Sequence, residues 1–363
     1  MPHGRFISNP ILSGCPTNCM RRLACLLAFA ACVACNAAPS KSSPKSVREV
    51  PVHFFNRDVR LAGTLVLPAA PGPHAAVVLL HGSGPQKRDL FMARWFAEQG
   101  VAALAYDKRG VGESGGDFRQ VPFMKLADDG LAAIAFLHTR PDIDRHKIGV
   151  WGLSQGGWLG PLAAARSSDV AFVISVSGPG VSPGEQMIFY YANELRSRGM
   201  SENDVQAVSI LRREVWASLH SGEHMDQARA DLAQSRNAPW YNQVKDQQDG
   251  LFERLQTPAD WEKARSSLWF QKEIGYDPVP ILQRVAVPAL FVFGAEDRLV
   301  PVKDSVDAIK GVSAADKEGF TIVVFPHADH TLHLVTAEGR GDLSPEYLQQ
   351  MQEWLGRHVL LTK

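Results

Sequence analysis

Short apolar runs alternate with amphipathic stretches along most of the chain. Segments 52–55 and 59–67 alternate in polarity on either side of Asn56-Arg57-Asp58, which predicts a β-hairpin. Continuous apolar runs predict further strands that are covered on both faces, and the stretches between them predict helices. The predicted strands are 75–80, 101–106, 148–151, 171–176, 289–293 and 320–325, and the predicted helices are 90–99, 123–139, 158–165 and 345–359. Their alternation predicts an α/β fold with a doubly wound, mostly parallel sheet.

One segment, 179–287, departs from this alternation. It shows no convincing strand pattern and contains charged, helix-prone stretches such as 202–219 and 227–235. Because it is too long for a crossover loop, we expect a helical cap insertion that divides the core into a first segment, 50–178, and a second segment, 288–363. The tryptophans of the insertion either fill a core of its own or line an apolar pocket: Trp216, Trp240, Trp261 and Trp269.

The composition and net charge indicate which kinds of molecule the protein is expected to bind. The chain has 363 residues, of which 45% are hydrophobic and 21% charged, as in a globular protein. Lys+Arg and Asp+Glu both number 38, so the formal net charge is zero. This balance gives no reason to expect a nucleic-acid partner.

The N-terminal region has the pattern of an export signal. Arg21 and Arg22 precede the uncharged apolar run 23–35, which is shorter than a membrane-spanning helix. We expect 1–38 to be a targeting segment, with the true start at Met20, and 39–49 to be a linker. The sequence therefore predicts an exported protein that is periplasmic, anchored in the outer membrane as a lipoprotein, or secreted.

The cysteines bear on the mode of export. All five precede residue 36, so the predicted folded domain has no cysteine from which a disulfide framework could form. Cys35 and Cys32 each follow small residues, as the lipidated cysteine of a bacterial lipoprotein does, although the match is imperfect. Membrane attachment through a lipidated Cys35 or Cys32 and freely soluble export both stay open.

A serine between glycines is the first candidate for chemistry. Gly152, Ser154 and Gly156 form a Gly-x-Ser-x-Gly pattern between a predicted strand and a predicted helix. The glycines indicate a backbone too crowded for a Cβ atom. Two interpretations follow: Ser154 is a helix N-cap in a glycine-rich turn, or it is a nucleophile presented on a strained turn.

Candidate partners for a nucleophilic serine follow later strands. A serine nucleophile needs a base, and the base needs an orienting carboxylate. Glu296 and Asp297 follow the predicted strand 289–293, and three histidines occur at 327–333 after strand 320–325. Groups at the carboxyl ends of parallel strands meet at one edge of the sheet. The chain order of serine, acid and histidine is the one expected for an α/β-hydrolase.

Five stretches carry a resemblance to a known superfamily. They are LLHGSGP (79–85), AYDKRGVGESGG (105–116), GLSQGG (152–157), FGAEDRLVP (293–301) and HADH (327–330). With these, the chain resembles secreted bacterial esterases of the α/β-hydrolase superfamily, in the dienelactone-hydrolase-like or serine-aminopeptidase-like branch. The resemblance implies the α/β-hydrolase fold, covers about 59–180 and 285–360, and leaves the insertion without a recognisable motif.

The resemblance also implies roles for individual residues. Ser154 matches the nucleophile, and Asp297 rather than Glu296 matches the acid that precedes the Leu-Val-Pro segment. His330 matches the base. His327 and His333 are the alternatives, His327 being close to the strand end and His333 lying where a helix is expected to begin.

The same motifs imply an oxyanion hole made of two backbone N–H groups. Gln155 supplies one at the predicted helix N-terminus, where the helix dipole favours negative charge. Ser83 supplies the second, in the His81-Gly82-Ser83-Gly84 loop. His81 is expected to brace this loop. Asp107 and Arg109 are expected to have structural roles.

Other functions compete with ester hydrolysis. The histidines at 327, 330 and 333, with Asp329 between them, are spaced like metal ligands, but such ligands converge only on a helix and this segment is predicted to be a loop. We expect neither a metal nor a cofactor. The predicted function is hydrolysis of a small-molecule ester through an acyl-enzyme. An exported aminopeptidase, a thioesterase and a catalytically silent binding protein of the same fold are the alternatives, and the sequence does not define the oligomeric state.

Overall fold

The structure is a computed structural model and describes residues 46–244, 250–313 and 319–361. The predicted targeting segment, most of the predicted linker, Cys32 and Cys35 lie outside these ranges. No helix in the described part of the chain combines the length and the apolar character that crossing a membrane requires.

The core is an eight-stranded sheet with the order β1-β2-β4-β3-β5-β6-β7-β8. Strands β1, β2 and β4 pair antiparallel, and every later pairing, from β4–β3 to β7–β8, is parallel. The strands are β1 (Arg48–Asn56), β2 (Val59–Leu67), β3 (His74–Leu80), β4 (Ala102–Tyr106), β5 (Ile143–Leu153), β6 (Val173–Val176), β7 (Ala289–Gly294) and β8 (Phe320–Phe325). The predicted mostly parallel sheet and its N-terminal hairpin are confirmed.

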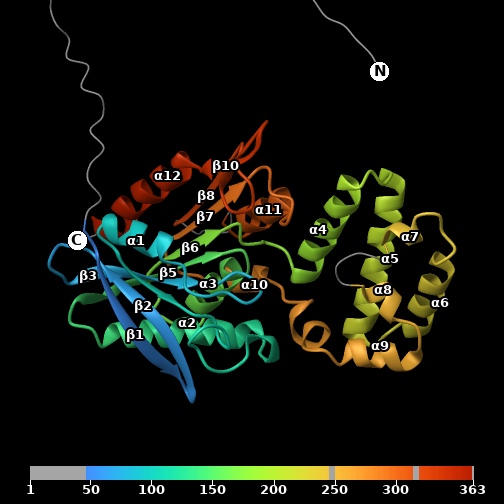
Figure 1. Cartoon of the computed structure of the whole chain (residues 1–363), viewed down its shortest axis with the longest axis horizontal. Helices are drawn as coiled ribbons and strands as arrows, with labels where there is room; N and C mark the ends of the chain where they lie inside the picture. The colour runs from blue at the N-terminus through green and yellow to red at the C-terminus, as the bar shows by residue number, and fades with distance from the viewer. Residues whose placement is uncertain (1–45, 245–249, 314–318, 362–363) are drawn as a thin grey trace, which may run out of the picture. The chain divides into compact units, whose positions relative to one another are not determined.

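Helices cover both faces of the sheet, as the continuous apolar strands require. Helices α1 (Leu90–Glu98) and α12 (Pro345–Leu355) pack on one face. Helices α2 (Phe123–His138), α3 (Gln155–Ala164) and α11 (Val302–Ser313) pack on the other (Figure 1). Short turns η1 (Phe118–Gln120) and η3 (Gly356–Leu360) accompany them. The central strand β5 is therefore enclosed on both sides, and its carboxyl end leads into α3.

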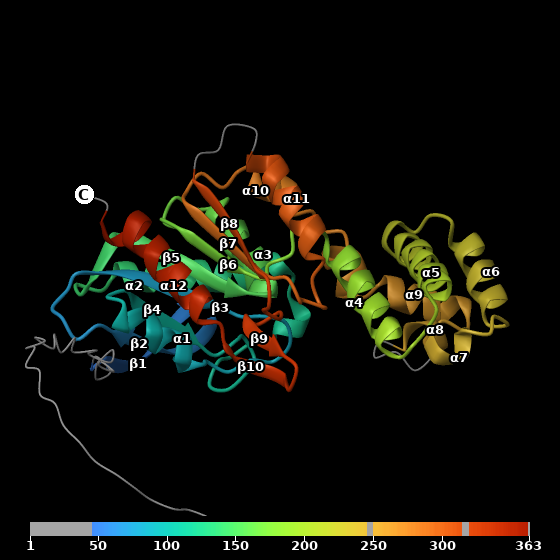
Figure 2. The same cartoon turned by 90° about the horizontal axis from the view of Figure 1, so that it is seen from above.

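All the regular elements described between β6 and β7 are helical (Figure 2). They are α4 (Pro183–Ser197), α5 (Glu202–Ser221), α6 (Met225–Ser235), α7 (Tyr241–Val244), α8 (Leu251–Arg254), α9 (Pro258–Arg265), η2 (Trp269–Glu273) and α10 (Val279–Leu282). Elements α4 to η2 enclose a hydrophobic core of their own that contains Trp216, Trp240 and Trp261, with Trp269 packed against it. Leu282 of α10 packs instead in the core of the sheet. Of the two expected roles for these tryptophans, the structure supports the first.

A second small sheet follows β8. Strands β9 (His333–Thr336) and β10 (Gly339–Leu343) form an antiparallel hairpin before α12. The expectation that a helix begins near His333 is wrong. The backbone N–H of Val335 donates to the His327 carbonyl, which holds the hairpin back against the end of β8.

Candidate active site

Ser154 lies on a sharp turn between β5 and α3. Its φ and ψ are 57° and −116°, a conformation that non-glycine residues rarely adopt. Its backbone N–H donates to Val176 O at 2.8 Å, which fixes the turn against the neighbouring strand β6. Ser154 occupies the N-cap position of α3, as one interpretation held, but its side chain makes no capping hydrogen bond, so the hydroxyl is not used to cap the helix.

The flanking glycines allow this turn to form. A Cβ atom on Gly152 would lie 2.2 Å from Gly156 O, and one on Gly156 would lie 2.7 Å from Leu80 O. Backbone atoms cannot yield as a flexible side chain does. The predicted crowding at both positions is confirmed, and it brings the start of α3 close to the loop that follows β3.

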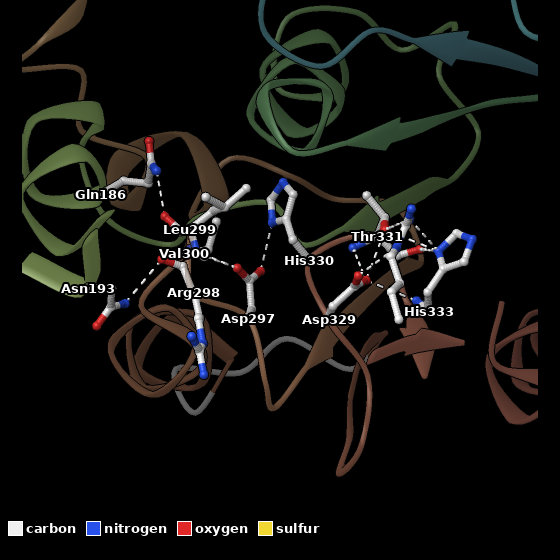
Figure 3. A network of polar contacts seen from close by, with 11 residues as sticks. Gln186, Asn193, Asp297, Arg298, Leu299, Val300, Asp329, His330, Thr331 and His333 are labelled. Atoms are coloured by element: carbon white, nitrogen blue, oxygen red, sulfur yellow. Dashed lines mark hydrogen bonds and ion pairs between the residues drawn. The ribbon is translucent and has the colours of Figure 1, made fainter. Parts of the chain in front are cut away.

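Asp297 and His330 meet across two loops, which follow β7 and β8. His330 Nδ1 donates to Asp297 Oδ2 at 2.8 Å, and the aspartate side chain is fully buried (Figure 3). The other oxygen, Asp297 Oδ1, accepts from the backbone N–H groups of Leu299 and Val300 at 2.7 and 3.0 Å. The carboxylate is thus held from two sides and orients the imidazole ring. Glu296 is exposed to solvent and its side chain makes no such contact.

The histidine loop has a hydrogen-bond network of its own. Asp329 Oδ1 accepts from the backbone N–H groups of Thr331 and His333 at 2.8 and 3.0 Å. Arg340, from β10, donates to Asp329 Oδ2, Thr331 Oγ1 and His333 Nδ1. Figure 3 shows the His333 ring turned away from Asp297 within this network. The sequence did not identify Arg340, because it lies in a hairpin that the pattern did not predict.

The three candidate histidines therefore have different environments. Only His330 contacts the buried carboxylate of Asp297, whereas His327 is exposed and His333 is bound to Thr331 and Arg340. Among the hydrogen bonds of the described residues, none joins the Ser154 hydroxyl to His330. In unliganded hydrolases this contact is often long and shortens when substrate binds.

The loop after β3 lies beside the nucleophile turn. Gly84 has a φ of +76°, and Gly82 N–H donates to Gln86 Oε1, so the loop is held by its own side chain. Ser83 is exposed at its tip. His81 donates from Nε2 to Tyr106 O at 2.6 Å, and burial lowers its pKa to about 4. A neutral, partly buried His81 braces the loop, as expected.

Lys108 joins the two sides of the predicted oxyanion hole. It is 2% exposed, and its Nζ donates to Gly82 O at 2.7 Å and to Gln155 Oε1 at 2.8 Å. Phe118 lies beneath the ammonium, 4.9 Å from it to the ring centroid. Burial lowers the pKa of Lys108 to about 8, and the Glu273 carboxylate raises it in part. Sequence reasoning missed Lys108, although it stands inside the recognised stretch 105–116.

Glu273 brings a carboxyl group from η2 of the insertion toward Lys108. Burial raises the pKa of Glu273 to about 7, and the positive charge of Lys108 opposes that rise. The insertion thus adds a titratable group near the loop after β3, in a segment where the sequence showed no motif.

Asp107 and Arg109 connect segments near the candidate active site through hydrogen bonds and an ion pair. Asp107 accepts from the backbone N–H groups of Arg88 and Glu113, each at 2.9 Å. Arg109 forms a buried bidentate pair with Asp129, at 3.0 and 2.5 Å. Both contacts tie structural segments together, in agreement with the expected structural roles.

The metal-like spacing of the histidines is not matched by their arrangement. Within residues 46–244, 250–313 and 319–361, no three His, Cys, Asp or Glu side chains come together as a group that could hold a metal ion. His330 instead uses one ring nitrogen for Asp297, and His333 bonds to Thr331.

Solved structures share this fold at low sequence identity. An α/β-hydrolase, GrgF, from Penicillium sp. sh18 aligns with a TM-score of 0.55 and 19% identity, covering 86% of this chain and 100% of that one. An esterase from Pyrococcus furiosus aligns with a TM-score of 0.53 and 16% identity, covering 86% and 91%. At this identity the likeness shows the α/β-hydrolase fold alone.

Sequence comparison gives information beyond the fold. Esterase EstD of Thermotoga maritima is 26% identical over 83% of this chain, and the chain spans 65% of the length of EstD, slightly less than two thirds. The family model described as "Serine aminopeptidase, S33" matches residues 71–335, well over half of the chain and including Ser83, Ser154, Asp297 and His330. With the sheet, the strained serine turn and the acid–histidine pair in place, the chain belongs to the serine aminopeptidase S33 family of the α/β-hydrolases.

Proposed function

We propose that this protein hydrolyses small-molecule carboxylic esters through an acyl-enzyme intermediate on Ser154. The observation that carries the proposal is the 2.8 Å hydrogen bond from His330 to the buried Asp297, on loops that follow β7 and β8. These loops join the edge of the sheet at which β5 presents Ser154. A histidine oriented in this way is the general base that a serine nucleophile needs.

Each residue then has a defined step. Ser154 Oγ attacks the ester carbonyl carbon while His330 Nε2 takes the serine proton, and Asp297 stabilises the imidazolium. The negative oxygen of the tetrahedral intermediate accepts from the N–H groups of Ser83 and Gln155. As the intermediate collapses, the C–O bond breaks and the alcohol takes the proton from His330. Water repeats the sequence on the acyl-enzyme and releases the acid.

The esterase name of EstD supports esters over other acyl substrates, whereas the family name refers to aminopeptidases. The same catalytic groups serve ester, thioester and amide bonds. The preference among these three bond types depends on how the rest of the substrate binds, so it has to be measured by comparing substrates.

The test compares substrate classes on one preparation of the chain from Ala37 onward. We expect p-nitrophenyl esters to be cleaved faster than aminoacyl-nitroanilides and acyl thioesters. A fluorophosphonate probe should label wild-type protein at one serine and should not label Ser154→Ala. Faster cleavage of nitroanilides would make the protein an aminopeptidase, and labelling without turnover of any substrate class would favour a silent binding protein.

We also propose that the protein is exported after removal of its N-terminal segment. The support is the sequence pattern of Arg21 and Arg22 followed by an apolar run. Mass spectrometry of protein from the native host should find a terminus beyond residue 31. A diacylglycerol-sized mass on Cys35 or Cys32 would establish a lipoprotein, and an intact Met1 or Met20 terminus would contradict export.

A further inference from the structure

Two adjoining cavities lie beside the candidate active site on the face of the sheet covered by α1 and α12. One, of about 340 Å³, lies behind the loop that follows β3, and the other, of about 380 Å³, lies between α1 and the β9–β10 hairpin. They share four lining residues, Asp89, Met92, Trp151 and Leu153. We call the two cavities together the side trough. Each alone has the size of a small-molecule pocket.

The lining of the side trough includes the sequence neighbours of three candidate site residues, although none of Ser83, Ser154, Gln155, Asp297 and His330 lines it. Gly82 lines it and precedes Ser83, Leu153 lines it and precedes Ser154, and Thr331 lines it and follows His330. These residues come from three different loops or strand ends. A group bound in the side trough would therefore contact residues that are one position along the chain from the nucleophile, the predicted oxyanion hole and the base.

The floor of the side trough is apolar. Met92, Leu153 and Val176 are apolar, and Trp151 Nε1 donates to Tyr347 Oη at 3.2 Å, so the indole N–H has a partner within the lining. Two arginines of the lining form ion pairs, Arg340 with Asp329 and Arg88 with Glu113. The side trough thus suits an uncharged, apolar alkyl or aryl group.

The position of the side trough relative to His330 indicates whether it would bind the alcohol part or the acyl part of an ester. His330 must give its proton to the oxygen of the departing alcohol, so the alcohol leaves on the histidine side. Thr331, which directly follows His330, and His333, three residues after it, line the second cavity. We propose that the side trough binds the apolar alcohol part of the ester, and that the acyl part lies outside it. This inference rests on the proposed function of the same site.

The test varies one half of the substrate at a time. Methyl, butyl, hexyl and 2-naphthyl acetates vary the alcohol, and methyl acetate, butyrate and octanoate vary the acid. Met92→Trp should fill the side trough, and Met92→Ala should enlarge it. Phe189→Trp places the same indole in a separate cavity, between α4, α5 and the start of α11, and is the matched control.

We expect Met92→Trp to lower kcat/KM for hexyl and 2-naphthyl acetate by about tenfold or more, because each buried methylene is worth about fourfold. Methyl acetate and methyl octanoate should change less than about twofold, and Phe189→Trp should not reproduce the pattern. Met92→Ala should raise the preference for 2-naphthyl acetate. This second variant keeps the test informative if the tryptophan variant folds poorly.

Two outcomes would overturn the inference. Loss confined to methyl octanoate would assign the side trough to the acyl part, and equal activity of all variants on all esters would leave it without a role in substrate binding. Fluorophosphonate labelling of Ser154 in each variant separates these results from failure of the proposed function. If wild-type protein is not labelled at Ser154, the catalytic assignment fails first.

Discussion

At the scale of single residues, substitutions can distinguish the catalytic acid and base, Asp297 and His330, from the neighbouring residues of the same type. Asp297 and His330 act in the transition state, so Asp297→Asn and His330→Ala should lower kcat, by up to about 10⁴-fold, and leave KM nearly unchanged. Ser154→Ala combined with His330→Ala should be barely worse than either change alone, because the residues work as a unit. Steady-state kinetics on a p-nitrophenyl ester measures both effects.

Two neighbouring histidines provide the controls for this prediction. His327 is exposed and His333 bonds to Thr331 and Arg340, so alanine at either position should keep most of the activity. If His327→Ala abolishes turnover and His330→Ala does not, the base is misassigned although the fold is unaffected.

Lys108 gives the second residue-scale prediction. Its ammonium holds Gly82 and Gln155 together, so Lys108→Met should loosen the predicted oxyanion hole and lower kcat by about 10- to 100-fold, with a smaller effect on KM. Lys125, which forms a half-exposed pair with Asp128 on α2, is the control, and Lys125→Met should be neutral. Equal kinetics for the two variants would contradict a positioning role for Lys108.

The pH profile tests the charge of Lys108 separately. Burial lowers its pKa to about 8, so the ammonium is present below that pH and loses its proton above it. Wild-type kcat should therefore fall as the pH rises through about 8, and Lys108→Met should lack this step. Because the Glu273 carboxylate raises the pKa of Lys108, Glu273→Gln should move the step to lower pH. An unshifted step would assign it to another group.

At the scale of elements, the β9–β10 hairpin contacts the histidine loop, but the turn of the loop itself is its main support. Asp329 accepts several hydrogen bonds within the loop, whereas Arg340 is largely exposed and reaches it from the hairpin. We expect Asp329→Ala to lower kcat several-fold more than Arg340→Met, since an exposed ion pair contributes only about 0–1 kcal/mol. The kcat values and thermal unfolding of both variants measure this. A larger loss for Arg340→Met would make the hairpin, and not the loop turn, the main support of His330.

The elements that the sequence predicted correctly are those with a strong hydrophobic period. Strands 75–80 and 289–293 are continuous apolar runs, and both lie in the sheet within one residue of the predicted bounds. The hairpin at 333–343 was missed because its strands are short and mostly exposed, so no burial pattern marks them. Lys108 was missed for a related reason: its partners, Gly82 and Gln155, are distant in sequence and meet only in the folded sheet.

At the scale of the whole fold, the insertion has its own hydrophobic core yet is tied to the catalytic loops. From α4, Gln186 donates to Leu299 O at 2.5 Å and Asn193 donates to Arg298 O at 3.1 Å. The carbonyl groups of this loop thus bind α4, while its backbone N–H groups, at Leu299 and Val300, donate to Asp297 (Figure 3). The position of α4 is thereby coupled to the residue that orients His330.

Removing both ties should loosen the acid loop without unfolding either core. Each such hydrogen bond contributes about 0.5–1.5 kcal/mol, so Gln186→Ala combined with Asn193→Ala should lower kcat only a few-fold. Hydrogen exchange should accelerate at the amides of 298–300 and remain unchanged in β3 and β5, where the parallel pairing is buried. Gln349→Ala, which removes an exposed bond to Glu353 on α12, is the control and should alter neither quantity. If exchange at 298–300 is unchanged while kcat falls, α4 acts on the substrate directly, and the coupling through Asp297 is wrong.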